Sequence, residues 1–215
     1  MIIERSQKRS LITEIRLGND KLEVVDNYKY LGHLINRQLL DDSDVKQRHC
    51  DFNSRFNSVF RNFKSVSLDT FLFLFDSYCL PDYGLNLWDC RTVFSKQAFK
   101  CFETSFSNAF KKIIGVPVYS SSHITADICN HLLLKHQVAL IQSRYLKRLF
   151  SLKNNIIRQC SSYIKSGYFC CSISNFFKDT YNIDIWEQEL DIVKARILWV
   201  QRHEERRGIC HFYKY

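Results

Sequence analysis

Glycine and proline are scarce in this chain, with 6 and 2 residues among 215. All-β sandwiches and barrels need many turns built from these residues, so their scarcity favours a helix-rich fold. No apolar run approaches the roughly 20 residues that a membrane-spanning helix needs. The first residues also lack the apolar core of a signal peptide. We therefore expect a protein of the nucleus or cytoplasm that is neither secreted nor held in a membrane.

Paired metal-binding motifs are also missing, although the chain has 9 cysteines. No Cys-x-x-Cys occurs, the number is odd and no secretory signal is seen, which favours reduced thiols that pack as small apolar side chains. Two sets of candidate ligands have spacings that fit no zinc pattern. They are Asp127, Cys129, His131 and His136, and then Cys170, Cys171, His203, Cys210 and His211. The sequence thus predicts no metal site, no cofactor and no catalytic residue.

Aromatic and basic residues are what the chain has in plenty. Aromatic residues make up 14% of the sequence, 17 of them phenylalanine, and 46% of all residues are hydrophobic. This content is ample for a folded core and excludes a disordered chain. The net charge of +9 favours a polyanionic partner, most often nucleic acid.

The expected fold is mainly α, with a short N-terminal antiparallel β-meander followed by a multi-helix bundle. In 12–36, short apolar runs alternate with turn signals, of which Gly18-Asn19-Asp20 is the strongest. Helical spacing of apolar residues begins after residue 41. The expected helices are one of about 22 residues after 41–43, then 68–80, 93–114, 122–131, 135–152 and 186–203. We divide the chain into a meander (1–40), a helical region (41–152) and a poorly defined C-terminal helical connector (153–215).

The first two expected helices carry clear N-terminal signals. Asp41-Asp42-Ser43 is suited to cap the first, and Ser67 the second. The second helix is apolar on every side, which predicts a buried helix that Pro81 ends. The first is amphipathic, with an apolar stripe of Val45, Phe52, Phe56, Val59 and Phe63. Basic residues flank this stripe, Arg48 and Arg55 on one side, Lys46 and Lys64 on the other.

Three short boxes punctuate the chain: Tyr28-Lys29-Tyr30-Leu31-Gly32, then Pro81-Asp82-Tyr83-Gly84 with Trp88, and then Ile114-Gly115-Val116-Pro117. Their order and spacing resemble the segment that follows the catalytic palm in non-LTR (LINE-type) reverse transcriptases. There an aromatic-x-Tyr-Leu-Gly box lies on the hairpin that grips the primer. A long helix with an arginine near its start follows, as Arg48 and Phe52 do here. The resemblance covers residues 10–150 and implies that 41–152 is a thumb-like region.

One feature of that family is missing. Its polymerases hold two metal ions with an aromatic-x-Asp-Asp box, which precedes the Tyr-Leu-Gly segment. The chain's single Asp-Asp, Asp41-Asp42, follows that segment instead and occupies an expected helix cap. We therefore expect no polymerase activity from these residues. What the resemblance implies is backbone binding of RNA–DNA or duplex in one groove, lined by Tyr28, Lys29, Tyr30, Gly32, Lys46, Arg48, Arg55 and Lys64.

Two functional hypotheses remain. In the first, the chain is a non-catalytic fragment of a LINE-type reverse transcriptase, with at most nucleic-acid backbone binding. In the second, it is a basic helical protein-interaction domain without a nucleic-acid role, and Tyr28, Tyr30 and Leu31 only pack. The first hypothesis also predicts an exposed apolar patch around Ile15, Val24, Tyr30 and Leu34, and self-association through it.

Overall fold

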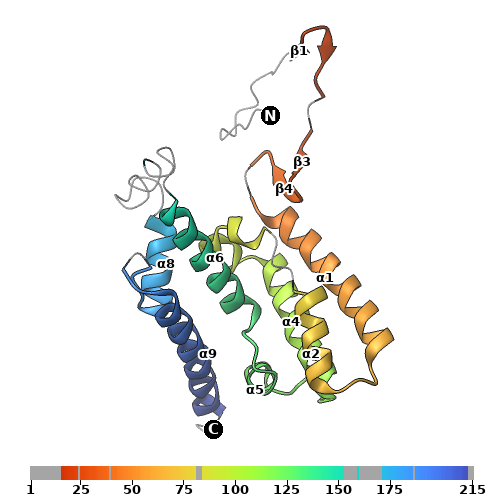
Figure 1. Ribbon diagram of the computed structural model, residues 1–215, viewed down its shortest axis with the longest axis vertical. Helices are drawn as coiled ribbons and strands as arrows, with labels where there is room; N and C mark the ends of the chain where they lie inside the picture. The colour runs from red at the N-terminus through yellow and green to blue at the C-terminus, as the bar shows by residue number, and fades with distance from the viewer. Residues whose placement is uncertain are drawn as a thin grey trace.

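The computed structural model describes residues 16–23, 25–38, 40–80, 84–152, 159, 171–185 and 187–212. Its fold is mainly α with short antiparallel strands near the N-terminus, which confirms the predicted fold class (Figure 1). Several residues used in the sequence predictions lie outside the described parts. They are Ile15, Val24, Pro81, Asp82, Tyr83, Cys170 and the side chains of Cys171, Cys210 and His211.

The expected meander is two separate hairpins. β1 (Arg16–Leu17) pairs with β2 (Asp20–Lys21), and β3 (Asn27–Tyr30) pairs with β4 (His33–Asn36), in two distinct two-stranded sheets. The first hairpin stands away from the helices at the end of an arm, whereas the second reaches the start of α1 (Asp42–Phe63) (Figure 1). Only the β3–β4 hairpin is therefore placed by the helical body.

The helices follow the predicted order with shifted ends. After α1 come α2 (Leu68–Tyr78), the 3-10 turn η1 (Leu85–Leu87), α3 (Cys90–Val93), α4 (Gln97–Ile114), α5 (Ser122–Ile128), α6 (Leu134–Ser151), α8 (Cys171–Tyr181) and α9 (Leu190–Phe212). The helix expected over 93–114 is α4, which begins four residues later at Gln97, and neither the short α3 before it nor α8 was predicted. Local signals fixed several ends: the Ser67 and Ser121 side chains accept hydrogen bonds from the N–H groups of Thr70 and Ile124.

A phenylalanine core joins α1, α2 and α4. The predicted α1 stripe is buried from Val45 to Val59, while Phe63 at the end of the helix is exposed. Phe75 of α2 is 0% exposed, and its ring centroid lies within 6.2 Å of those of Phe52, Phe56, Phe106, Phe110 and His131. Such clustered rings gain edge-to-face attraction in addition to the burial of their area.

The prediction that α2 is buried on every side is wrong. Phe71 and Phe75 face the core, but Phe73 is 69% exposed, and Leu68 and Tyr78 are exposed as well. The helix packs on α1 and α4, and Figure 1 shows it beside these two helices. Phe73 and Tyr78 are thus exposed on a side of the helix that also carries the polar residues Asp69, Asp76 and Ser77.

α6 belongs to two cores. Leu134 and Val138 pack into the phenylalanine core, while Ala139, Leu140 and Leu146 pack with residues of α8 and α9. The second core includes Phe177, Tyr181, Val193, Ile197 and Val200. Figure 1 shows α6 between these two groups of helices. The boundary that we drew at residue 152 therefore does not separate independent packing units.

Candidate nucleic-acid interface

The Tyr28–Gly32 box forms a hairpin with a two-residue turn. Tyr30 pairs with His33, which leaves Leu31 and Gly32 as the loop, with φ angles of 45° and 79°. Two consecutive positive φ angles are the signature of a type I′ turn, which matches the twist of the flanking strands. Glycine adopts such angles freely, but leucine pays a steric penalty. Leu31 is also 71% exposed, so no burial within the described structure offsets that penalty.

The outer strand of this hairpin displays its side chains to solvent. Tyr28 is 49% and Tyr30 57% exposed, and Lys29 between them is exposed too. Because side chains alternate along a strand, both tyrosines point to one face and Lys29 to the other. These residues are therefore not buried as a packing face, and two phenol rings and an ammonium group are available for a partner.

Asp44 fixes the hairpin to the first turn of α1. Its Oδ1 accepts a hydrogen bond from the Leu34 N–H at 2.9 Å, and its Oδ2 accepts one from the Trp88 indole N–H at 2.8 Å. The Nδ1 of His33 lies 3.1 Å from Oδ2. Arg48 completes the joint, since its Nη2 donates to the Gly32 carbonyl at 2.7 Å and its Nε lies 3.5 Å from Oδ2.

Gly84 leaves room for this arginine. It has a φ of +82°, and a Cβ built on it would lie 2.9 Å from Arg48 Nη2 and 3.6 Å from His33 Nδ1. A larger residue would therefore be strained and would also displace the guanidinium. Two of the sequence boxes and the arginine of α1 thus meet at one joint, through Gly32, Arg48, Gly84 and Trp88. We call this set, with Asp44 and His33, the Asp44 joint.

The pKa values of Asp44 and of the neighbouring Asp41 are shifted in opposite directions. Burial raises the pKa of Asp44, but hydrogen bonds from His33, the Leu34 N–H and Trp88 more than offset this, and its pKa is lowered. Burial dominates at Asp41 and raises its pKa, although a hydrogen bond from the Asp89 N–H opposes this shift. Asp44 is therefore held as a carboxylate that accepts from several donors.

The predicted capping role of Asp41 is not seen. Asp41 occupies the N-cap position of α1 but its side chain makes no cap hydrogen bond. Instead its Oδ2 accepts from the Asp89 N–H at 2.9 Å, which ties η1 and α3 to the start of α1. Asp42, the other member of the pair, lies 3.7 Å from Lys96. The two carboxylates therefore serve different contacts.

The Arg48 side chain does not line the predicted groove. Its side chain is buried in the Asp44 joint, so its guanidinium is aimed at a carbonyl and a carboxylate rather than at solvent. The physical reason is that the buried Asp44 carboxylate needs a compensating charge, and Arg48 follows it by one helical turn. We therefore assign Arg48 to the positioning of the hairpin.

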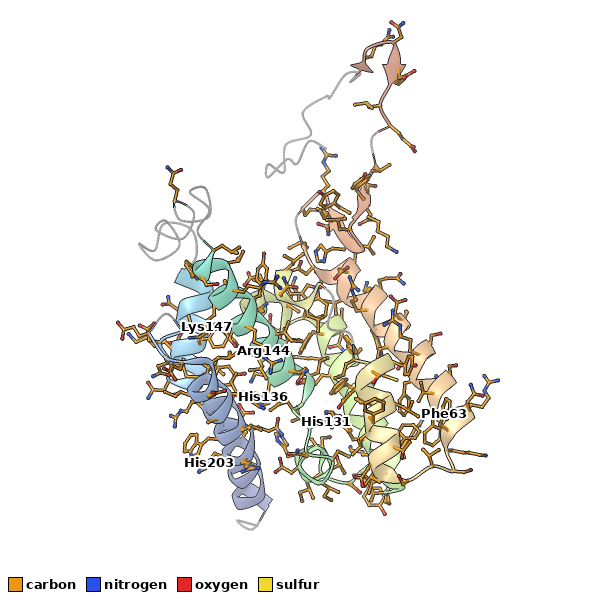
Figure 2. All side chains as sticks on the ribbon, viewed as in Figure 1. Phe63, His131, His136, Arg144, Lys147 and His203 are labelled. Carbon is orange, nitrogen blue, oxygen red and sulfur yellow. The ribbon has the colours of Figure 1, made fainter. Side chains whose placement is uncertain are left out.

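The other three basic residues predicted to line the groove do not form one groove with the hairpin. Lys46, Arg55 and Lys64 are all exposed. However, the spacing of Lys46 and Arg55 puts them roughly 180° apart around the helix. Lys64 lies roughly 27 Å beyond Lys46 along the axis, next to Phe63 at the end of α1 far from the hairpin (Figure 2). Lys46 alone shares the first turns of α1 with the joint.

Sequence reasoning missed Asp44 and His33. The hydrogen-bond donors to Asp44 lie ten and 44 positions away in the chain, at Leu34 and Trp88, and His33 lies beside Asp44 only after the hairpin docks on α1. The one local signal was the spacing of four between Asp44 and Arg48, which allows a helical ion pair. In the parts of the chain that the structure describes, no three His, Cys, Asp or Glu side chains gather closely enough to hold a metal ion. No described helix is both long and apolar enough to cross a membrane.

Comparison with known proteins adds no relative. No protein-family model matches the chain, and neither a curated protein nor a solved structure matches it.

Replacing Leu31 by asparagine is expected to stabilise the β3–β4 hairpin by about 1 kcal/mol, because asparagine tolerates a positive φ at this turn position. The amide protons of β3 and β4 should then exchange with solvent about fivefold more slowly. Leu31→Ala is the control, since alanine keeps the steric penalty and should leave exchange unchanged. Equal exchange rates in the asparagine and alanine variants would show that the turn is not strained.

Proposed function

We propose that this chain binds nucleic-acid backbone through the β3–β4 hairpin, as the primer-grip and thumb part of a LINE-type reverse transcriptase. The supporting observation is the Asp44 joint. Two of the boxes that carry the resemblance, and the arginine of the following helix, meet there and hold an exposed tyrosine-bearing strand against α1. The proposal assigns no polymerisation to these residues, because the sequence holds no aromatic-x-Asp-Asp box.

The exposed groups suit a sugar-phosphate strand. Lys29 and Lys46 are exposed cations that can neutralise phosphates, and the net charge of +9 attracts the polyanion from a distance. Tyr28 and Tyr30 offer ring faces and hydroxyl groups to sugars or to an unpaired base. None of these groups is arranged to read base edges in a groove. Binding is therefore expected to be independent of sequence.

Replacing Lys29 and Lys46 together by alanine is expected to weaken binding to two unrelated duplexes equally. It should also flatten the log–log dependence of affinity on salt by about two units, since each neutralised phosphate contributes about 0.9. Fluorescence anisotropy with labelled duplex DNA and RNA–DNA hybrid, from low to moderate salt, measures both quantities.

The matched control removes two exposed lysines from the far side of α6, Lys178 of α8 and Lys194 of α9. It changes the net charge equally but should leave the salt dependence within about half a unit. A larger loss in the control than in the Lys29 and Lys46 variant would move the binding surface to the C-terminal helices. That result would remove the support for a primer-grip hairpin.

The alternative is a protein-interaction domain, and the exposed outer face of α2 favours it. Leu68, Phe73 and Tyr78 leave large apolar side chains uncovered on this helix. The absence of any nucleic-acid binding at low salt, from a folded chain, would favour this alternative over the proposal.

A further inference from the structure

The outer face of α9 carries a row of uncovered apolar side chains. Ile192 is 52% and Trp199 45% exposed, and Ala195 between them is exposed as well. Their spacing of three and four residues puts them on one stripe of the helix. A second stripe of the same helix, with Val193 and Ile197, is buried in the core that α9 shares with α6 and α8. α9 thus has apolar residues on two faces, and the described part of the chain covers only one of them.

The indole of Trp199 is ordered by its neighbours on this face. The guanidinium carbon of Arg196 lies 4.2 Å from the centre of the indole, and the His203 ring, one turn later on α9 (Figure 2), stacks on it at a centroid distance of 3.8 Å. Arg196 Nε in turn donates to the Tyr181 carbonyl at 2.8 Å, and His203 Nδ1 donates to a carbonyl of its own helix at 2.9 Å. An exposed tryptophan that is already ordered loses little conformational entropy on binding, which suits an interface anchor.

The charges beside this stripe have one sign. The segment 192–203 holds Lys194, Arg196 and Arg202 but no aspartate or glutamate. At 3.6 residues per turn, Arg196 and Arg202 lie roughly 60° to either side of Trp199. The nearest carboxylate before the segment, that of Asp191, is roughly 12 Å from Trp199 along the axis. The surface around the indole is therefore positive.

The spacing of the stripe indicates what can cover it. Ile192, Ala195 and Trp199 follow one another as i, i+3 and i+7, the seam along which a second helix packs. A helix laid along this seam can place acidic side chains beside Arg196 and Arg202. A second copy of the chain would bring the same arginines together, so like charges oppose self-pairing here. The stacked arginine and histidine also take up ring surface that a nucleobase would need.

We propose that the outer face of α9 binds an acidic amphipathic helix of a partner protein, with Trp199 as its central anchor. An apolar side chain of the partner packs against the indole and Ile192, while its carboxylates pair with Arg196 and Arg202. This face is separate from the β3–β4 hairpin, so the inference goes beyond the proposed nucleic-acid function and does not depend on it.

The test is a titration of the folded chain with a peptide of about three heptads that carries leucine at positions a and d and glutamate at e and g. The glutamates keep this peptide from pairing with itself. We expect a Kd of about 0.1 mM, because the peptide must fold as it binds. Nuclear magnetic resonance shifts of the Trp199 indole N–H and of the α9 amides report the binding. Trp199→Ala removes an exposed side chain and should weaken binding at least tenfold.

A charge exchange makes the test independent of Trp199. The same peptide with lysine in place of glutamate should bind the unaltered chain at least tenfold more weakly. Arg202→Glu should weaken binding of the glutamate peptide at least fivefold and strengthen binding of the lysine peptide. Arg148→Glu, the same change at an exposed position of α6, should leave the binding of both peptides within twofold.

Three results would overturn the proposal. The first is equal binding of the two peptides, or binding of neither. The second is a chain that is dimeric in solution and becomes monomeric in Trp199→Ala, since a second copy would then cover this face. The third is single-stranded DNA that shifts the same α9 signals at lower concentration than the glutamate peptide, because the face would then bind nucleic acid.

Discussion

Phe75→Ala is expected to lower the free energy of unfolding by about 4 kcal/mol, as full truncation of a buried phenylalanine typically does. The ring is 0% exposed and contacts the rings of α1 and α4 from the middle of α2, so its loss leaves a cavity that rigid neighbours cannot fill. Urea-induced unfolding followed by circular dichroism measures the change.

Phe73→Ala is the matched control on the same helix. Phe73 is mostly exposed, so its truncation should change the free energy of unfolding by less than about 0.5 kcal/mol. A similar loss in both variants would mean that the outer face of α2 is covered in solution, for example by a second copy of the chain. The solution mass would then be expected to exceed that of a monomer.

Asp44→Ala is expected to cost about 3–5 kcal/mol, because it removes the carboxylate that faces the buried Arg48 guanidinium and the acceptor of the Trp88 indole N–H. Asp42→Ala, two residues earlier in α1, removes a partly exposed ion pair with Lys96 and should cost less than about 1 kcal/mol. If the two variants lose equal stability, the Asp44 joint does not hold the hairpin. Nucleic-acid binding should also weaken in Asp44→Ala, since the tyrosine-bearing strand is then no longer fixed to α1.

Acid should act on the same joint. The pKa of Asp44 is lowered in the folded chain, so its contribution to stability is complete above the ordinary pKa of an aspartate, about 3.9. That contribution is lost as the pH falls through the lowered value. The difference in unfolding free energy between the unaltered chain and Asp44→Ala is therefore expected to shrink below about pH 4.

The fold could be predicted wherever its causes are local. Ser67 and Ser121 mark helix starts, and Gly115 ends α4 with a φ of 79°, because each acts on backbone groups within four residues. The exposed face of α2 was missed because most residues of this helix are phenylalanine, leucine or tyrosine, although its polar residues Asp69, Asp76 and Ser77 all lie on the exposed side. α8 was not predicted because the sequence around residues 171–181 shows no clear apolar periodicity.

The candidate site was predictable only in part. The box residues and Trp88 were recognised by resemblance, and the exposure of Tyr28 and Tyr30 agrees with a role outside the core. The Arg48 side chain points inward because it faces the Asp44 carboxylate. That carboxylate is held in turn by the indole N–H of Trp88, a residue 44 positions further along the chain. Buried polar residues such as Gln142, which donates to the Trp88 carbonyl at 2.5 Å, give no periodic signal and become visible only when the segments meet.

The double membership of α6 has a consequence for cooperativity. One face of this helix closes the phenylalanine core and another closes the core of α8 and α9, so neither core can open fully without exposing the other. Two hydrogen bonds also link α6 to the elements on its two sides. Gln142 of α6 donates to the Trp88 carbonyl next to η1, and Gln201 of α9 accepts from the Leu133 N–H at 2.9 Å. The helical body is thus expected to melt in a single transition. A destabilising substitution in α8 or α9 would then raise the fraction of unfolded chains. It would thereby lower the fraction of chains with a folded Tyr28–Gly32 strand, although it lies far from the hairpin.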